Sequence, residues 1–258
     1  MKIAIQQMSS VLGDLNTNFK SIVKASIEAS LKGAELLIVP ELAPTGYGAK
    51  DALNEKAVTA DQNGLNLLCK TSAEHNIAIV VGYSERSGDR VFNSAAFITN
   101  GKVQANYHKC QLWAGYEKRY FTAGPPSTVI TNYKGLRIGM LICYDVEFPE
   151  RVRALAKKGV DLIAVPTATP ASTVATFIAE KMISVRAFEN QSFIAYVNHH
   201  GNDGNFSYAG LSCIAAPDGT LIAQAEVEGD ALLYADIDPS KYSYLQTELP
   251  YLKDLIEE

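Results

Sequence analysis

The chain has 258 residues, of which 47% are hydrophobic and 20% charged, a composition that suits one α/β domain or two small ones. The formal net charge of -5 argues against nucleic acid and anionic membrane surfaces as partners. The sequence contains no apolar run of membrane-spanning length and no secretory signal pattern, so we expect a soluble, cytoplasmic protein.

The first half of the chain alternates between strand and helix patterns. Residues 16–32 have helical periodicity and are followed by Gly33, where a C-cap glycine belongs. Asn100-Gly101 indicates a tight hairpin, and segment 109–128 is predicted to be irregular. In chain order, the predicted elements are strand 2–6, helix 16–32, strand 36–39, helix 64–75 and strands 77–83, 92–99 and 103–108.

The second half begins with a buried strand that ends abruptly at Cys143. Gly159 ends the next helix, and Asp218-Gly219 indicates another hairpin. The tail after residue 238 is acidic, with interspersed tyrosine and leucine. The predicted elements are strand 136–142, helix 149–158, strand 162–165, helix 174–190 and strands 193–198, 208–215 and 220–225.

The two halves resemble each other in sequence and in element order. K-G-A-E-L-L-I-V-P at 32–40 matches K-G-V-D-L-I-A-V-P at 158–166. Each half alone would cover one sheet face with helices, and stacking the two sheets would bury the other faces. We therefore predict an α/β fold, a four-layer α-β-β-α sandwich with an internal pseudo-twofold repeat. It would form a single domain over residues 1–258, with the sandwich core at 1–238 and a C-terminal tail at 239–258.

Cys143 stands where a strand gives way to a helical pattern. A thiol at such a junction lies at the carboxyl edge of the sheet, where open α/β folds place their ligands. The partial positive charge of the following helix N-terminus would favour a thiolate. The alternatives are a small buried residue without chemistry and a redox-sensing thiol.

Three ionisable residues follow predicted strands directly, namely Glu41, Lys109 and Cys143. If those strands share a sheet or face one another, the three side chains converge. Cys143 would be the nucleophile and Glu41 the general base. Lys109, together with the backbone N–H after Cys143, would stabilise an oxyanion. Separately, each has a structural alternative, because a glutamate after proline and a lysine at a strand end are common surface residues.

The sequence does not predict a metal or an organic cofactor. The four cysteines are widely spaced without a C-x-x-C, which favours free thiols in a reducing compartment. His199 and His200 would point to opposite faces of an extended segment, and no H-E-x-x-H is present. Neither a P-loop nor a dinucleotide-binding motif occurs.

V-P-E ending at Glu41, Y-H-K ending at Lys109 and I-C-Y-D around Cys143 resemble the three signatures of the nitrilase superfamily of carbon–nitrogen hydrolases. The family's order of Glu, Lys and Cys is kept, and its sandwich fold agrees with the repeat. The resemblance implies the same three catalytic roles. It also implies that Glu117, in the segment before F-T-A-G, positions the substrate amide and hydrogen-bonds to Lys109.

The stretch C-Y-D-V-E-F-P-E from Cys143 is similar to the stand-alone amidases, whereas true nitrilases more usually carry Cys-Trp-Glu. We therefore expect a thiol amidohydrolase that cleaves small carboxamides, without cofactor and as a homodimer or higher homo-oligomer. The alternatives are an N-carbamoyl amine hydrolase, an ω-amide hydrolase and a catalytically silent binding protein. The candidates for lining the substrate pocket are Tyr47, Trp113, Tyr144, Thr167 and Ala168.

Overall fold

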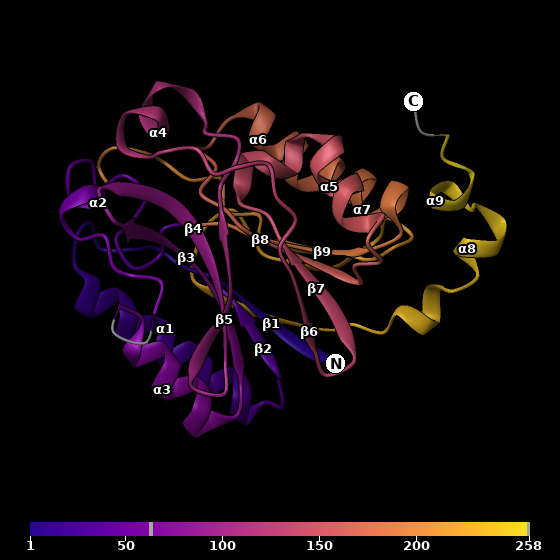
Figure 1. The fold of residues 1–258 in the computed structure, drawn as a ribbon, viewed down its shortest axis with the longest axis horizontal. Coiled ribbons are helices and arrows are strands. Elements are labelled where there is room, and N and C mark those ends of the chain that lie inside the picture. The colour runs from indigo at the N-terminus through magenta and orange to yellow at the C-terminus, as the bar shows by residue number, and fades with distance from the viewer. Residues whose placement is uncertain (62–63, 257–258) are drawn as a thin grey trace.

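The computed structural model describes residues 1–61 and 64–256. Two six-stranded sheets pack face to face, and helices cover their outer faces (Figure 1). This arrangement confirms the predicted four-layer α-β-β-α sandwich. The longer helices are α1 (Leu15–Leu31) and α3 (Asn66–His75) on the first sheet, and α5 (Pro149–Ala156) and α7 (Ile183–Asn190) on the second.

The two sheets have the same strand order and the same strand directions. In each, two neighbouring pairs are parallel and the remaining pairs are antiparallel. The first sheet runs β12 (Ala231–Asp236), β1 (Lys2–Gln7), β2 (Leu36–Ile38), β3 (Ala78–Ser87), β4 (Arg90–Thr99), β5 (Lys102–His108). The second runs β6 (Ile130–Tyr133), β7 (Leu136–Met140), β8 (Leu162–Pro166), β9 (Phe193–Val197), β10 (Cys213–Ala215), β11 (Leu221–Gln224). The strand β12 thus stands where β6 stands in the other half, which gives the pseudo-twofold relation.

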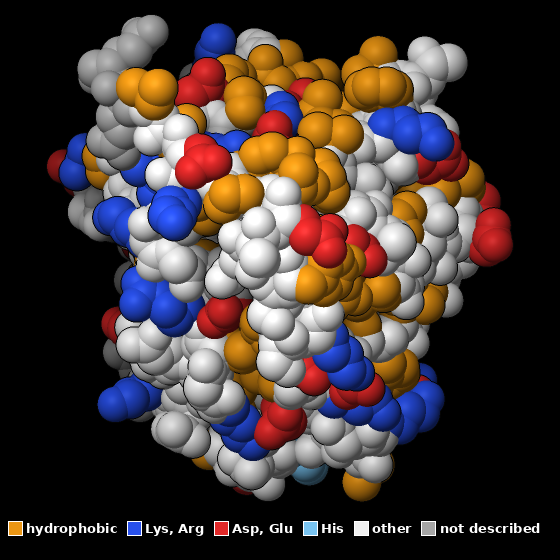
Figure 2. Space-filling view, turned by 90° about the vertical axis from the view of Figure 1, so that its right-hand side faces the viewer, with side chains coloured by type: hydrophobic (Ala, Val, Ile, Leu, Met, Phe, Trp, Pro, Cys, Tyr) orange, Lys and Arg blue, Asp and Glu red, His pale blue; other side chains and the backbone are white. Residues whose placement is uncertain are grey.

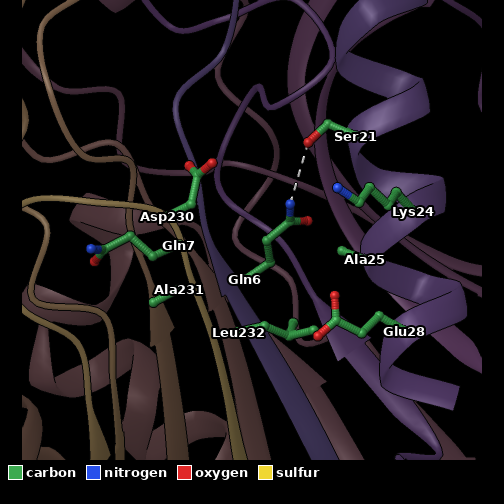
Figure 3. Close-up of a pocket in the computed structure, with 9 residues that line it drawn as sticks. All are labelled: Gln6, Gln7, Ser21, Lys24, Ala25, Glu28, Asp230, Ala231 and Leu232. Atoms are coloured by element: carbon green, nitrogen blue, oxygen red, sulfur yellow. Dashed lines mark hydrogen bonds between the residues drawn. The ribbon is translucent and has the colours of Figure 1, made fainter. Parts of the chain in front are cut away.

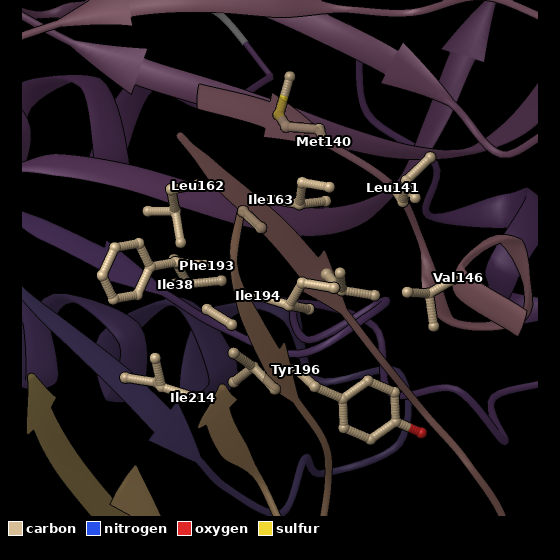
Figure 4. Close-up of a cluster of buried hydrophobic side chains, with 14 of the residues drawn as sticks. Ile38, Met140, Leu141, Val146, Leu162, Ile163, Phe193, Ile194, Tyr196 and Ile214 are labelled. Carbon is tan, nitrogen blue, oxygen red and sulfur yellow. The ribbon is translucent and has the colours of Figure 1, made fainter. Parts of the chain in front are cut away.

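Alternating side chains divide the core into layers. Ile3 and Ile5 of β1 pack in the cluster between the sheets, whereas Ala4 packs in the cluster under α1 and α3. In β2, Ile38 faces the second sheet and Leu37 faces the helices. Since successive strand residues point to opposite faces, strands buried on both sides must be apolar throughout. Figure 4 shows the inter-sheet layer, where Ile38 lies among side chains from the second sheet.

Several predicted elements differ from the structure at edges and loops. Segment 208–215 is a strand only from Cys213 onward, because Gly210 and Leu211 have left-handed backbones with φ of 61° and 54°. Segment 109–128 is not wholly irregular, since it contains α4 (Ala114–Tyr120). The predicted helix 174–190 is divided into α6 (Thr173–Phe177), a π-helical turn (Ile178–Met182) and α7.

The remaining short elements lie outside the two sheets. They are α2 (Ala52–Glu55), the 3₁₀ helix η1 (Cys143–Glu147) and, after β12, the 3₁₀ turn η3 (Pro239–Tyr242), α8 (Leu245–Glu248) and α9 (Tyr251–Asp254). Figure 1 shows the C-terminal segment (yellow) leaving β12 and running along one side of the sandwich to α7. Among the residues that the structure describes, no helix has the length and apolarity that a membrane crossing requires.

Candidate active site

The two sheets together place three ionisable side chains at one site. Glu41 follows β2, and Lys109 follows β5, which runs in the same direction, so both leave the same edge of the first sheet. Lys109 Nζ donates to Glu41 Oε1 at 2.7 Å. Cys143 follows β7 of the facing sheet and lies within electrostatic reach of both groups. The predicted convergence at the strand ends is therefore present.

Lys109 is a fully buried ammonium that joins two carboxylates. Its Nζ also donates to Glu117 Oε1 at 2.6 Å, and both glutamates are 0% exposed. Asn93 Nδ2 donates to Glu41 Oε1 at 2.6 Å, and the Tyr47 hydroxyl donates to Glu117 Oε1 at 2.9 Å. Buried charges persist only when they are paired and hydrogen-bonded, and this cluster meets that condition.

Glu117 reaches the site because α4 begins where the chain turns inward. Its Oε2 accepts a hydrogen bond from the backbone N–H of Trp113, the residue that precedes the helix, at 2.8 Å. A carboxylate on a free N–H of the first helical turn is a stabilising arrangement. Both Glu117 oxygens are thus held in place, and Oε1 faces the Lys109 ammonium.

The charges of the cluster do not balance, and this shifts the pKa values. Burial, together with repulsion from Glu117, raises the pKa of Glu41 to about 7 against the attraction of Lys109. Burial alone would lower the pKa of Lys109, but the two carboxylates raise it well above its ordinary value. Lys109 therefore stays an ammonium, whereas Glu41 can take up and release a proton near neutral pH.

One oxygen of Glu41 is available for proton transfer. Its Oε2 is buried and has no hydrogen-bond partner among the described residues, whereas Oε1 is held by Lys109 and Asn93. The Glu41 backbone is also fixed, since its N–H donates to the Thr167 carbonyl at 3.3 Å and its carbonyl oxygen lies 2.7 Å from His199 Nε2. A carboxylate with one anchored and one free oxygen suits a general base.

Gly82 of β3 leaves the space that the Glu41 backbone occupies. A Cβ at this position would lie 2.6 Å from Glu41 Cα and 2.8 Å from the Pro40 carbonyl oxygen. We predict that Gly82→Ala displaces Glu41, lowers kcat for the site's reaction about tenfold or more and costs about 1–3 kcal/mol of unfolding free energy. Steady-state kinetics and urea unfolding measure both quantities.

Gly115→Ala is the matched control for Gly82→Ala. A Cβ on Gly115, in the exposed first turn of α4, would have no neighbour within 4 Å. Its activity should stay within about twofold of the parent, because the added methyl group displaces nothing. Equal activities of the two variants would show that Gly82 does not position Glu41.

Cys143 occupies a constrained turn rather than a regular helix start. It is the first residue of η1, its φ of 45° is left-handed, and the residue is 8% exposed. A left-handed non-glycine residue costs energy, and such strain clusters at functional sites. Its Sγ lies 3.6 Å from the hydroxyl oxygen of Thr169, which is 2.6 Å from the hydroxyl oxygen of Tyr196.

The pKa of Cys143 corrects one prediction. We expected the helix N-terminus to favour a thiolate, but burial, followed by the charge of Glu41, raises the pKa of this thiol well above its ordinary value, against the attraction of Lys109. The resting side chain is therefore a neutral thiol at pH 7. Activation of this sulfur needs a base that removes the proton during attack, and Glu41 is the titratable group with a pKa in the right range.

Asp145 connects the Cys143 turn to the chain that follows Lys109. Its Oδ2 accepts from the Ile142 backbone N–H at 3.2 Å and from the Tyr107 hydroxyl at 2.9 Å. Its Oδ1 accepts from the Gln111 backbone N–H at 2.8 Å. One buried carboxylate thus fixes the segments on either side of the site.

The candidate pocket residues lie around a small cavity that reaches Cys143. It offers about 20 Å³ to the centres of water molecules. Of the residues predicted for this role, Tyr47, Trp113, Tyr144 and Ala168 line it. Thr167 does not, because its hydroxyl turns back to the Val165 carbonyl at 3.0 Å.

Three further lining residues were not predicted from the sequence, namely Glu147, Thr169 and Pro170. Glu147 belongs to the stretch that resembles amidases, and Thr169 is two residues beyond Thr167. Spacing could have suggested both, since side chains two apart in an extended segment share a face.

A more open hollow lies elsewhere, between α1 and the strands β1 and β12 (Figure 3). Gln6 and Ser21 approach each other there, with Nε2 to Oγ at 3.5 Å. Lys24 and Glu28 line the α1 side, and the hollow holds no thiol. It therefore has no nucleophile comparable to Cys143.

The other cysteines and the histidines do not enlarge the site. All four cysteines are free and buried. Within residues 1–61 and 64–256, no group of three His, Cys, Asp or Glu side chains is arranged to hold a metal ion. His199, the histidine nearest the site, instead lies against the Glu41 and Met8 carbonyl oxygens through its two ring nitrogens.

Comparison with known proteins agrees with this geometry. Residues 2–245 match the carbon–nitrogen hydrolase family. The chain is similar to a protein of Pseudomonas protegens named "Hydrolase in pqqF 5'region", with 34% identity, covering 98% of this chain and 88% of the relative. It is also 29% identical to an (R)-stereoselective amidase of a Pseudomonas species, covering 98% and 91%.

Solved structures of an amidase from Nesterenkonia sp. AN1, of the nitrilase superfamily, are similar to this chain. One has a TM-score of 0.88 and 31% identity, and covers 99% of this chain and 94% of its own. Others of that amidase hold butyramide, or acrylamide added covalently at the active-site cysteine.

Proposed function

Because the chain belongs to the carbon–nitrogen hydrolase family and is an amidase of the nitrilase superfamily, we propose that Cys143, Glu41, Lys109 and Glu117 hydrolyse small carboxamides to a carboxylic acid and ammonia. The observation that carries these roles is the buried Glu41–Lys109–Glu117 cluster beside the thiol. It combines a nucleophile, a base of suitable pKa and a fixed positive charge in one water-poor site.

In the first half of the reaction, Cys143 Sγ attacks the amide carbonyl carbon while Glu41 takes the thiol proton. Negative charge develops on the carbonyl oxygen, where Lys109 and the backbone N–H after Cys143 stabilise it. The carbonyl re-forms, the C–N bond breaks, and Glu41 returns the proton to the leaving nitrogen, which departs as ammonia. Glu117 holds the substrate amide group and fixes Lys109.

In the second half, water replaces ammonia and hydrolyses the thioester. Glu41 removes a proton from this water as it attacks the acyl carbon, and the Cys143–acyl bond breaks. The thiol regains its proton, and the carboxylic acid leaves. One base thus serves both halves, which requires a pKa near the working pH, as Glu41 has.

The cavity favours short, uncharged acyl groups over bulky ones. Its free volume of about 20 Å³ is little more than one water molecule needs, and Tyr47, Trp113 and Tyr144 form aromatic walls. The similar Nesterenkonia amidase has been solved with butyramide, an amide of this size. Amides of two to five carbons are therefore the first substrates to test.

An ammonia-release assay over short aliphatic amides, an N-carbamoyl amine and a nitrile tests the proposal. We expect release from propionamide and butyramide, and loss of release in Cys143→Ala. Activity confined to the carbamoyl amine would move the enzyme to that alternative. No turnover of any compound by the folded protein would favour a silent binding protein.

The pH dependence of kcat/KM should report Glu41. The base must be ionised to accept the thiol proton, and burial raises its pKa to about 7. We predict that kcat/KM for propionamide falls about tenfold per pH unit below 7 and levels off above it. A profile that stays flat down to pH about 5 would contradict Glu41 as the titrating base.

Association into a homo-oligomer, a cytoplasmic location and the single-domain division all stay predictions. Exposed hydrophobic side chains support the first, because Val174, Phe177 and Val185 project from α6 and α7, and Leu255 and Ile256 follow α9. Figure 2 shows hydrophobic side chains gathered on the upper part of the face that carries the C-terminal segment. Light scattering after size-exclusion chromatography measures the stoichiometry.

A further inference from the structure

The wall of the active-site cavity carries an acidic residue that the reaction does not use. Among the described residues lining the cavity, Glu147 is the one whose side chain is charged in its ordinary ionisation state. It ends η1, four residues after Cys143. No hydrogen bond or ion pair joins its carboxylate to another residue in the described part of the chain.

Neighbouring cations are committed to other partners. Lys109 divides its charge between Glu41 and Glu117. Arg186 of α7 donates to the backbone carbonyls of Val146 and Glu147 and pairs with Glu189 at 3.1 Å. Arg186 thus supports the turn that presents Glu147, while its own charge is directed to Glu189.

Glu147 stands toward the mouth of the cavity. Cys143, Tyr47 and Ala168 are buried, whereas Glu147, together with Trp113, is only partly buried. A substrate whose carbonyl carbon lies at Cys143 must extend its acyl chain toward the partly exposed side. The far end of that chain then meets the Glu147 carboxylate in surroundings with little water, where charges interact strongly.

We propose that Glu147 is a specificity-determining residue that favours amides whose acyl chain ends in a cation and rejects those ending in a carboxylate. This inference rests on the proposed amidase function and names its substrate class. An ammonium gains an unpaired carboxylate as its partner, whereas a terminal carboxylate is repelled by it. The ω-amides of dicarboxylic acids are accordingly poor substrates.

Two pairs of amides of matched shape test this proposal. The first pair is 4-aminobutanamide and pentanamide, which exchange an ammonium for a methyl group. The second is succinamate and 4-methylpentanamide, which exchange a carboxylate for an isopropyl group. At pH about 8.5, where Glu147 is ionised, we expect kcat/KM to be about tenfold higher for 4-aminobutanamide and about 100-fold lower for succinamate.

Glu147→Gln keeps the shape of the side chain and removes its charge. Both ratios should then fall within about threefold of one, while kcat/KM for pentanamide changes by less than about threefold. Glu150→Gln, an exposed change in α5, should keep the parent ratios. If Glu147→Gln does not fold, Glu147→Met must give the same collapse of the ratios.

The outcomes separate this inference from the function on which it rests. Turnover of both neutral amides with no preference between charged and neutral partners would overturn the role of Glu147, as would ratios that persist in Glu147→Gln. If no amide is turned over, the proposed function fails. Calorimetric binding of the same four amides to Cys143→Ala then decides the charge preference without chemistry, and equal affinities would overturn it.

Discussion

Glu41→Gln is expected to lower kcat for amide hydrolysis by about 10²–10⁴-fold while the protein keeps its fold. The amide oxygen of glutamine can still accept from Lys109 and Asn93, so the hydrogen bonds at Oε1 survive. At Oε2, however, the group that accepts the thiol proton is lost. Because the Cys143 thiol is neutral at pH 7, attack without that base is slow.

Stopped assays of ammonia release and urea unfolding measure the two quantities for Glu41→Gln. We expect the unfolding free energy to change by no more than about 1 kcal/mol, since no buried hydrogen bond at Oε1 is lost. Glu150→Gln serves as the matched control. Activity of Glu41→Gln within about threefold of the parent would mean that another group accepts the proton.

Lys109→Met should lower both activity and stability. Methionine fills a similar volume but leaves Glu41 and Glu117 facing each other without the ammonium between them. Removing one partner of a buried ion pair typically costs about 3–5 kcal/mol. Loss of a group that stabilises an oxyanion costs about 10²–10³-fold in kcat.

The stability loss in Lys109→Met should depend on pH. Without Lys109, the folded-state pKa values of the two carboxyls lie above their unfolded values. Such groups contribute stability below the unfolded pKa and lose it as pH rises through the folded pKa. Urea unfolding at pH about 5 and 8 should therefore show the larger loss at pH 8. An equal loss at both pH values would contradict the account, and Lys118→Met, exposed on α4, is the control.

The central residues of the site were predictable because each one ends a short buried strand. The apolar runs before Glu41 and Cys143 are unambiguous strands, and strands of one direction present their carboxyl ends at the same edge. Glu117 is different. Its helix α4 spans Ala114–Tyr120, too short for a periodic pattern, and only the family resemblance identified it.

Other features depend on contacts that no local pattern carries. The strand β12 pairs with β1 across nearly the whole chain, Lys2 opposite Asp236, and its residues are only half-buried. The choice between Thr167 and Thr169 turned on where the extended backbone ends, since a shift of one residue reverses the face. The raised pKa of Cys143 comes from burial, which a sequence does not display.

The most direct test of the account is the mass of Cys143 during turnover. The enzyme is mixed with propionamide, quenched in acid within milliseconds and digested, and the peptide that contains Cys143 is weighed. We predict an added propionyl group on that peptide in the parent, and its absence in Cys143→Ala. Rapid ammonia release without any acyl adduct on Cys143, or with the adduct on another residue, would contradict the thioester mechanism.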